Sequence, residues 1–179
     1  MSVFDRATHY GSVSILNHWI VAVLIVIMLA LGLIMGEFPK GELHSTLVQI
    51  HKSIGVFLLL YGAWRVLWRL VFRFPDEASA MAAWQAWIAK AVHWFLLLAI
   101  VVMPLSGYIG SSSGGHPVTF FGLFALPALP ENEALNGAAF ELHEILAYIL
   151  IGVIALHALA ALKHHLIDKD DTLRRMIGR

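Results

Sequence analysis

Hydrophobic residues along the chain form four long runs, separated by short stretches that are more polar. Each run approaches or exceeds the roughly 20 apolar residues that a helix needs to cross the hydrocarbon core of a bilayer. The pattern therefore predicts an all-α fold, an integral membrane four-helix bundle. We expect its helices at about 12–36, 47–73, 86–110 and 138–165.

The longest connection, 111–137, has a pattern of its own. It opens with a flexible Ser- and Gly-rich link, and the apolar stretch from His116 to Pro130 that follows is broken by three prolines. Proline lacks the backbone N–H that a continuous helix requires. We therefore expect a re-entrant or interfacial cap over the outer face of the bundle. The whole chain, 1–179, is expected to form a single membrane domain.

Composition supports the membrane prediction. The chain is 59% hydrophobic and 13% charged, whereas soluble domains carry about 25% charged residues. The expected surroundings are the lipid bilayer, and no nucleic-acid partner is expected. The chain has no cysteine, which excludes disulfides, cysteine-ligated iron–sulfur clusters and thioether attachment of haem. Ten histidines remain as the main candidates for metal ligands.

The net charge is zero, but the cations are unevenly distributed. Lysine and arginine flank the second loop and fill the C-terminal tail, whereas the third loop, 110–141, has none; the flanking and tail cations are Arg65, Arg69, Arg73, Lys90, Lys163, Lys169, Arg174, Arg175 and Arg179. Cytoplasmic loops of membrane proteins carry the excess of Lys and Arg. We therefore expect cytoplasmic N- and C-termini and a location in the bacterial inner membrane, with the first and third loops in the periplasm.

Four histidines lie within the predicted helices. Ionisable residues at membrane depth are costly and are by default a functional hypothesis. His143 and His157 are 14 residues apart, so their rings leave the same face of one helix, separated by about 21 Å. Depth matches His157 with His18 near the inner side, and His143 with His51 near the outer side.

Two histidine pairs stacked in this way predict two haem groups, each held between two imidazoles. Without a Cys-x-x-Cys-His motif the haems are expected to be non-covalent haem b, and with both axial positions filled they would transfer electrons. A single helix histidine can instead be a hydrogen-bonded interfacial residue. Two histidines at each depth are too few for a closed tetrahedral zinc or copper site.

Several neighbours of these histidines have two interpretations. Arg65 and Arg69 fit haem propionates, because guanidinium binds carboxylate in a fork, but they also fit charges that set the topology. Gly55 would let a macrocycle approach its helix or would let two helices pack closely. We expect His93 to make a polar contact near the inner haem rather than to ligate it.

Five segments of the chain resemble motifs of the prokaryotic cytochrome b561 family: Ile15–Trp19, His51–Gly55, Gly115–Leu123, Leu142–Glu144 and Leu156–Ala158. The resemblance covers essentially the whole chain. It implies a four-helix membrane protein with two b haems and the same four histidine ligands that the depth argument selects.

The resemblance also implies an activity. Stand-alone members of this size take electrons from superoxide at the outer face and reduce ubiquinone in the membrane, so a superoxide:quinone oxidoreductase is expected. Lys52, next to His51, is the outer cation best placed for the anionic substrate. The quinone is expected between the third loop and the outer start of the second helix.

Two other functions stay open. The first is a haem-bearing relay or anchor subunit for a periplasmic dehydrogenase, hydrogenase or soluble cytochrome. The outer loops favour it in one respect, because they carry only Lys40 and Lys52 as cations; their acidic residues are Glu37, Glu42, Glu131, Glu133, Glu141 and Glu144. The second is a non-redox membrane scaffold, which would bind no haem.

Overall fold

The computed structural model describes residues 2–72, 74–76 and 82–178. Arg73 and Arg179, two of the cations counted above, lie outside these residues. The described elements are α1 (Ser12–Met35), α2 (Glu42–Val71), α3 (Ala83–Ser113), β1 (Thr119–Phe120), β2 (Phe124–Ala125), α4 (Glu133–Lys163), a π-helical turn η1 (His164–Asp168) and α5 (Thr172–Met176).

The predicted all-α membrane fold is confirmed, since four helices are long and apolar enough to cross a bilayer. Their ends differ from the expected positions. The hydroxyl of Thr46 donates to the carbonyl of Glu42, and α2 starts at Glu42 instead of residue 47. The hydroxyl of Ser113 donates to the Ile109 carbonyl at 2.7 Å. Helix α3 continues to Ser113 instead of ending at residue 110. Hydrophobic runs mark only the membrane-crossing part of a helix, so they miss such polar ends.

The start of α4 has a capping residue that explains it. The side chain of Asn132 accepts a hydrogen bond from the backbone N–H of Leu135 at 2.9 Å. Asparagine is among the best N-cap residues, because its oxygen satisfies an N–H that has no partner within the helix. Glu133 in the first turn adds a favourable charge at the positive end of the helix dipole. The helix therefore begins at Glu133 and not near residue 138.

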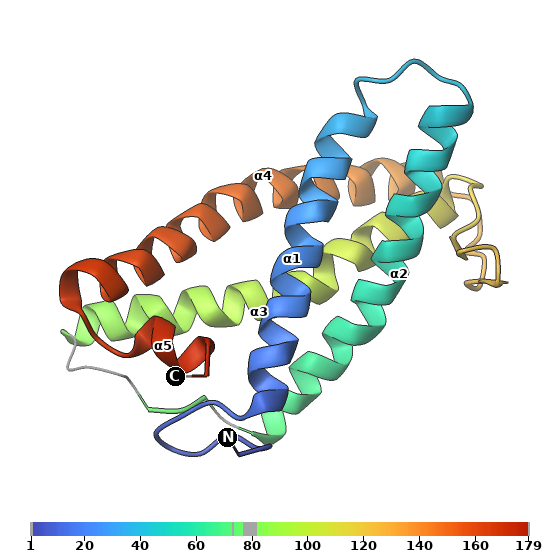
Figure 1. Cartoon of the computed structure of the whole chain (residues 1–179). Coiled ribbons are helices and arrows are strands. Elements are labelled where there is room, and N and C mark those ends of the chain that lie inside the picture. The colour runs from blue at the N-terminus through green and yellow to red at the C-terminus, as the bar shows by residue number, and fades with distance from the viewer. Residues whose placement is uncertain (1, 73, 77–81, 179) are drawn as a thin grey trace.

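The four long helices form two antiparallel pairs. Figure 1 shows the α1–α2 pair crossing in front of the α3–α4 pair. The main backbone contacts join α1 to α2, α2 to α3 and α3 to α4. Both chain termini lie at one end, which we call the inner end, and the 114–132 connection lies at the opposite, outer end.

The contact between α2 and α3 rests on a glycine and a proline. Pro104 has no N–H to give to the carbonyl of Ile100, four residues earlier in α3. Gly62 of α2 packs against this carbonyl, and a Cβ at position 62 would come within 2.9 Å of its oxygen. Val21 and Leu97 are buried with Ile100 in the same core cluster. The two helix pairs therefore meet where a side chain is missing on α2.

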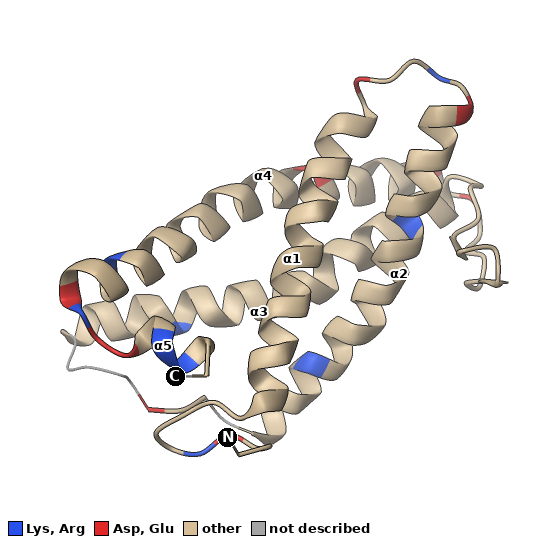
Figure 2. Ribbon diagram, in the orientation of Figure 1, with Lys and Arg blue, Asp and Glu red and all other residues tan. Residues whose placement is uncertain are grey.

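Charged residues gather toward the helix ends, as Figure 2 shows, and α1 carries none along its length. At the inner end, Asp5 accepts hydrogen bonds from the Gly11 N–H at 2.7 Å and from Ser14 at 2.8 Å. The same carboxylate pairs with Arg69 at 2.9 Å, and both side chains are almost completely buried. The N-terminal segment is thereby tied to the inner ends of α1 and α2.

At the outer end, the predicted cap contains a β-hairpin that the sequence interpretation did not anticipate. β1 pairs with β2 in antiparallel register, and the turn between them has positive φ at Phe121 (44°) and Gly122 (73°). Two positive-φ residues in succession favour a tight hairpin. Ser53 of α2 donates to the Thr119 carbonyl at 3.2 Å and accepts from the Phe121 N–H at 3.0 Å. The hairpin is thus fixed to α2.

Candidate cofactor-binding site

The four predicted histidines come together as two pairs at different depths. At the outer level the rings of His51 on α2 and His143 on α4 have centroids 6.2 Å apart. At the inner level the rings of His18 on α1 and His157 on α4 are 6.3 Å apart. Each pair joins α4 to a helix that is not among its main packing partners. The two rings of each pair therefore meet where α4 has few backbone contacts with α1 or α2.

These ring separations suit a metal held between two imidazoles. A metal–nitrogen bond of about 2.0 Å, with about 1.1 Å from nitrogen to ring centre, puts two rings on opposite sides of one ion about 6.2 Å apart. A direct hydrogen bond between two imidazoles would bring the rings closer. The donor set at each level is two imidazoles that can be neutral, and a six-coordinate haem iron can take such a set.

A cavity of about 440 Å³ opens around the outer pair. Its volume falls within the range of about 300–1,000 Å³ that is usual for small-molecule and cofactor sites. His51 and His143 both line it, and so does Gly55. A Cβ at position 55 would meet only Met28 Cε, at 3.9 Å. The missing side chain at Gly55 therefore widens the cavity; it does not serve close helix packing.

Helix α3 orients the ring of His143. Its Nδ1 lies 2.9 Å from the carbonyl oxygen of Met103 and 3.1 Å from the hydroxyl of Ser106. A carbonyl oxygen can only accept, so Nδ1 must carry the proton, and Nε2 keeps the lone pair that can bind a metal. A Cβ at Gly107 would lie 2.9 Å from Cε1 of this ring. Gly107 therefore makes the space in which the ring lies.

His51 is positioned differently. Its Nδ1 is buried and has no hydrogen-bond partner among the described residues. A buried polar nitrogen without a partner is costly, which is the situation expected where a bound group completes the site. The Cβ of a residue at position 32 would meet the His51 ring at 3.5 Å, so Gly32 of α1 leaves ordinary contact space beside it. The outer residues fit a haem.

The inner pair has a third imidazole beside it. The ring of His93 on α3 makes an edge-on contact with His157 at 5.6 Å and stacks on Phe74 at 5.8 Å. His93 thus lies beside the inner pair, and its expected polar contact near the inner haem stays a prediction. Trp19 makes a similar edge-on contact with His18 at 5.2 Å. Rings from α1 and α3 therefore support the inner pair.

Arg65 and Arg69, equivalent in the sequence analysis, have different partners. The guanidinium of Arg69 is paired with Asp5 and also donates to Ser14 and to the carbonyl of Phe72. Arg65 donates to the carbonyl of Asn17 at 3.4 Å, next to His18. The side-chain nitrogen of Asn17 is buried without a partner among the described residues. Arg65 and Asn17 are therefore donors beside the inner pair. Arg69 instead pairs with Asp5 and fixes the N-terminal segment to α2, and we call this contact the N-terminal anchor.

Lys52 and Glu144 bring charge to the lining of the outer cavity. Both line it, and the ammonium group of Lys52 donates to the Pro117 carbonyl at 3.4 Å. Val118 and Leu126 of the outer connection also line the cavity. Lys52 is thus next to the outer pair, as expected, and it is also a contact between α2 and the cap.

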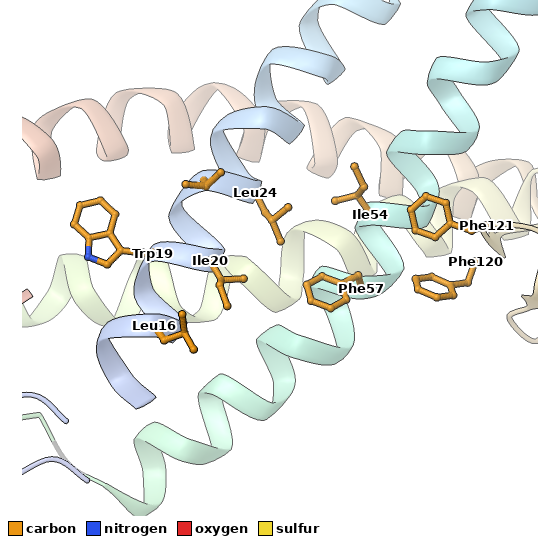
Figure 3. Close-up of a pocket in the computed structure, with 9 residues that line it drawn as sticks. Leu16, Trp19, Ile20, Leu24, Ile54, Phe57, Phe120 and Phe121 are labelled. Atoms are coloured by element: carbon orange, nitrogen blue, oxygen red, sulfur yellow. The ribbon is translucent and has the colours of Figure 1, made fainter. Parts of the chain in front are cut away.

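An apolar groove runs over the opposite, outward side of α1 and α2. Figure 3 shows Phe57 and Ile54 of α2 beside Phe120 and Phe121 of the hairpin, with α1 side chains along the other wall. Its volume is about 630 Å³. The groove therefore reaches from the hairpin toward Trp19, near the inner end.

Sequence reasoning missed the residues that hold the histidines. Ser106 and Gly107 follow Pro104 in an apolar helix, and nothing in the periodicity connects them with His143, 36 or more positions later. Asn17 precedes His18, so its position beside a candidate ligand was the one available signal. The pairing of these residues with particular rings depends on how α3 packs against α4.

Comparisons with known proteins give one family. A model of the family described as prokaryotic cytochrome b561 matches residues 9–179. Cytochrome b561 homolog 2 of Escherichia coli is 37% identical over 182 residues, covering all of this chain and 96% of the relative. Cytochrome b561 homolog 1 of the same organism is 30% identical, covering 95% and 97%. The probable superoxide oxidase CybB of Yersinia pestis is 30% identical, covering 95% and 96%.

Proposed function

Because the chain belongs to the prokaryotic cytochrome b561 family, whose members are haem b membrane proteins that transfer electrons, we propose that it is a superoxide:quinone oxidoreductase. It takes electrons from superoxide at the periplasmic face and delivers them to ubiquinone in the bilayer. The similarity to a relative named as a probable superoxide oxidase supports this donor. The whole chain acts as one membrane domain.

The observation that carries the proposal is the facing histidine pair at each depth. His51 with His143, and His18 with His157, would each hold one haem b, their rings being 6.2 and 6.3 Å apart. A haem held by two imidazoles would supply one-electron transfer. Along α4 the two ligand positions are separated by about 21 Å, so together the pairs bridge much of the apolar core.

Other residues complete each site. Beside the inner pair, Arg65 and the free amide nitrogen of Asn17 bind carboxylate groups of the cofactor through charge-assisted hydrogen bonds. At the outer pair, Gly55 leaves room for a flat ring system and Gly107 leaves room for the His143 imidazole.

The overall reaction balances with two donors for each acceptor. Two superoxide anions each lose one electron and leave as dioxygen. One quinone gains these two electrons and two protons and becomes a quinol. Lys52, in the lining of the outer cavity, attracts the anion, because a cation beside a cavity raises the local concentration of anions.

For the quinone we propose the region between the hairpin and the outer half of α2. The groove in Figure 3 is lined there by Ile54, Phe57, Phe120 and Phe121. A lipid-facing apolar surface suits the hydrocarbon tail of ubiquinone. Lys52 and Ser53 lie on the adjoining turn of α2 and hold the hairpin.

The acidic outer end favours a second candidate function. Glu131, Glu133, Glu141 and Glu144 are all exposed and give the outer end negative charge; Glu144 also lines the outer cavity. Such a surface repels superoxide but attracts a basic protein. An electron-relay or anchor subunit for a periplasmic dehydrogenase, hydrogenase or soluble cytochrome is therefore the alternative.

The test uses the full chain purified in detergent. A dithionite-reduced minus oxidised spectrum with a haem count is expected to show b-type haem at two per chain. Superoxide is then expected to reduce the haems rapidly, and a soluble quinone to reoxidise them. His51→Ala is expected to lose one haem, whereas the control His44→Ala, on the same helix at the outer end, is expected to retain both.

Each other result has a definite meaning. Two haems that do not respond to superoxide would favour the relay subunit. A well-folded protein without haem would contradict both redox functions and would leave the scaffold.

A further inference from the structure

The β-hairpin at the outer end exposes an apolar tip. The side chains of Phe121, Leu123 and Phe124 are exposed at 57%, 77% and 50%, and Leu123 is the most exposed large hydrophobic residue in the described part of the chain. Leu60 and Leu156, on the membrane-crossing helices α2 and α4, are exposed at 64% and 68%. The tip is therefore as open to its surroundings as side chains on the outside of the membrane helices.

The sequence around this tip carries no charge. From Pro117 to Pro130 there is no Asp, Glu, Lys, Arg or His, and the outer glutamates begin only at Glu131. A contiguous exposed apolar surface marks a contact with a protein or with a membrane. A basic protein would be attracted by the glutamates, and the uncharged tip offers it no such attraction. Lipid is therefore the occupant that the composition of the tip favours.

The backbone of the hairpin is also suited to apolar surroundings. The two strands pair with one another, the Leu123 N–H donates to the Phe120 carbonyl at 2.8 Å, and the Leu126 N–H donates to the Val118 carbonyl at 2.9 Å. Ser53 of α2 accepts a further N–H from the turn at 3.0 Å. Backbone groups without a partner are costly in lipid. The paired hairpin can therefore enter the edge of the bilayer at a lower cost than an open loop.

The attachment to α2 gives the hairpin a depth. Ser53 comes eleven positions after Glu42, the first residue of α2, so the hairpin is fixed about 16 Å along this helix from its outer start. Lys52 is the last charged residue of α2 before Arg65. The hairpin, which Figure 1 shows beside the outer part of α2, is thus attached where the polar outer part of the helix changes to an uncharged stretch. That change marks the boundary between headgroups and acyl chains.

We propose that the β1–β2 hairpin is an interfacial anchor, whose tip, residues 121–124, inserts among the lipids of the leaflet at the outer end. Elements that lie at a membrane surface bury their apolar side chains about 5–10 Å into the boundary between headgroups and acyl chains. The groove of Figure 3 continues this surface, because Phe120 and Phe121 line it together with apolar side chains of α1 and α2.

The anchor also connects the bilayer with the outer cavity. The stems of the same hairpin contribute Val118 and Leu126 to the lining of that cavity. With the tip held among lipids, an apolar molecule dissolved in this leaflet can reach the groove without entering water. The anchor itself needs neither haem nor a particular electron donor.

The test uses the absence of cysteine from the chain, so that each substitution gives a full-length protein with a single thiol. Leu123→Cys is placed in nanodiscs of phosphatidylethanolamine and phosphatidylglycerol, which leave both membrane faces open to reagents. It is treated with a sulfonated maleimide that stays in water and, separately, with an alkyl maleimide that dissolves in lipid. The controls are Lys40→Cys, in the exposed first loop, and Leu60→Cys, on the outside of α2.

Leu123→Cys is expected to react with the sulfonated maleimide about tenfold more slowly than Lys40→Cys, because a thiol in apolar surroundings carries little reactive thiolate. It should prefer the alkyl maleimide to the same degree as Leu60→Cys. Fast reaction with the sulfonated reagent would overturn the proposal and indicate a surface for a soluble partner. Slow reaction with both reagents would also overturn it, because protein would then cover the tip. If Leu123→Cys did not fold, Phe124→Cys would provide the same measurement.

Discussion

At the scale of single residues, Ser106 and Gly107 on α3 determine the orientation of the His143 ring on α4. His143 is oriented by the Met103 carbonyl and Ser106, and its ring occupies the space left by Gly107. These contacts set the tautomer of the ring without touching its metal-facing nitrogen. Hydrogen bonds to the ring nitrogen that does not bind the metal govern how firmly such a ligand is held.

Gly107→Ala tests this arrangement. A Cβ there would lie 2.9 Å from Cε1 and 3.1 Å from Nδ1 of His143, so the ring must move. Overpacking of this kind costs about 1–3 kcal/mol, and the displaced imidazole should no longer hold its haem. The haem count is expected to fall from two to one per chain.

The control for Gly107→Ala is Gly152→Ala on α4, where a Cβ meets nothing within 4 Å. Alanine is favoured over glycine in a helix by up to about 1 kcal/mol, so this variant should keep both haems and equal or greater stability. An unchanged haem spectrum in Gly107→Ala would show that the ring has room to move without losing its ligand geometry.

Residues of one type, one helical turn apart, can also differ in role. Arg65 and Arg69 share a stripe on α2, but Arg69 is turned to Asp5 and the N-terminal segment, whereas Arg65 is turned to Asn17 and the inner histidine pair. The difference comes from what packs on each part of the stripe. A spacing of four residues predicts a shared face, not a shared partner.

At the scale of elements, the two helix pairs are joined through one close contact between α2 and α3. Gly62 approaches the Ile100 carbonyl, which Pro104 leaves without its helical partner. A Cα–H can make a weak hydrogen bond to such an oxygen. This contact sets how near α2 comes to α3, and therefore the width of the outer cavity between them.

Gly62→Ala is expected to destabilise the bundle by about 1–3 kcal/mol, because the new methyl group would meet backbone atoms that cannot rotate away. Thermal unfolding in detergent, followed by circular dichroism and by haem absorbance, measures the change. Gly137→Ala near the start of α4 is the control, since its Cβ has open space. Equal unfolding temperatures for the two variants would refute the close contact.

At the scale of the whole molecule, the two ends of the bundle differ in chemistry. Both termini, the N-terminal anchor and α5 are tied together at the inner end, where Trp19 donates to the Met176 carbonyl and Arg175 to the Asp76 carbonyl. The outer end carries the hairpin and exposed glutamates. This asymmetry matches the distribution of Lys and Arg that places cationic ends in the cytoplasm.

We therefore predict cytoplasmic N- and C-termini. A green fluorescent protein fused after residue 179 should fluoresce in a bacterial host, whereas alkaline phosphatase at the same point should be inactive. The reverse pattern is expected for both reporters inserted between Pro39 and Lys40, in the first loop. Active phosphatase at the C-terminus would show the opposite topology, with the His51–His143 pair on the cytoplasmic side.

The sequence by itself determined the four membrane helices, the depths of four histidines and their grouping into two levels. The physical reason is that a spanning helix is long, apolar and regular, so each position has a known height and face. The family resemblance, which the comparisons confirm, rests on motifs around the same histidines. The height and the face of each residue follow from the geometry of its own helix, without knowledge of the neighbouring helices.

Only the tertiary structure decided what surrounds each ring. The hairpin on Ser53, the contact of Gly62 with the Ile100 carbonyl and the hydrogen bonds of His143 all join residues far apart in the chain. Helical periodicity does not state which neighbour a face meets, because that depends on crossing angles and on where small residues let backbones approach. The difference between the outer and inner pairs therefore comes from packing, although the histidines themselves are visible in the sequence.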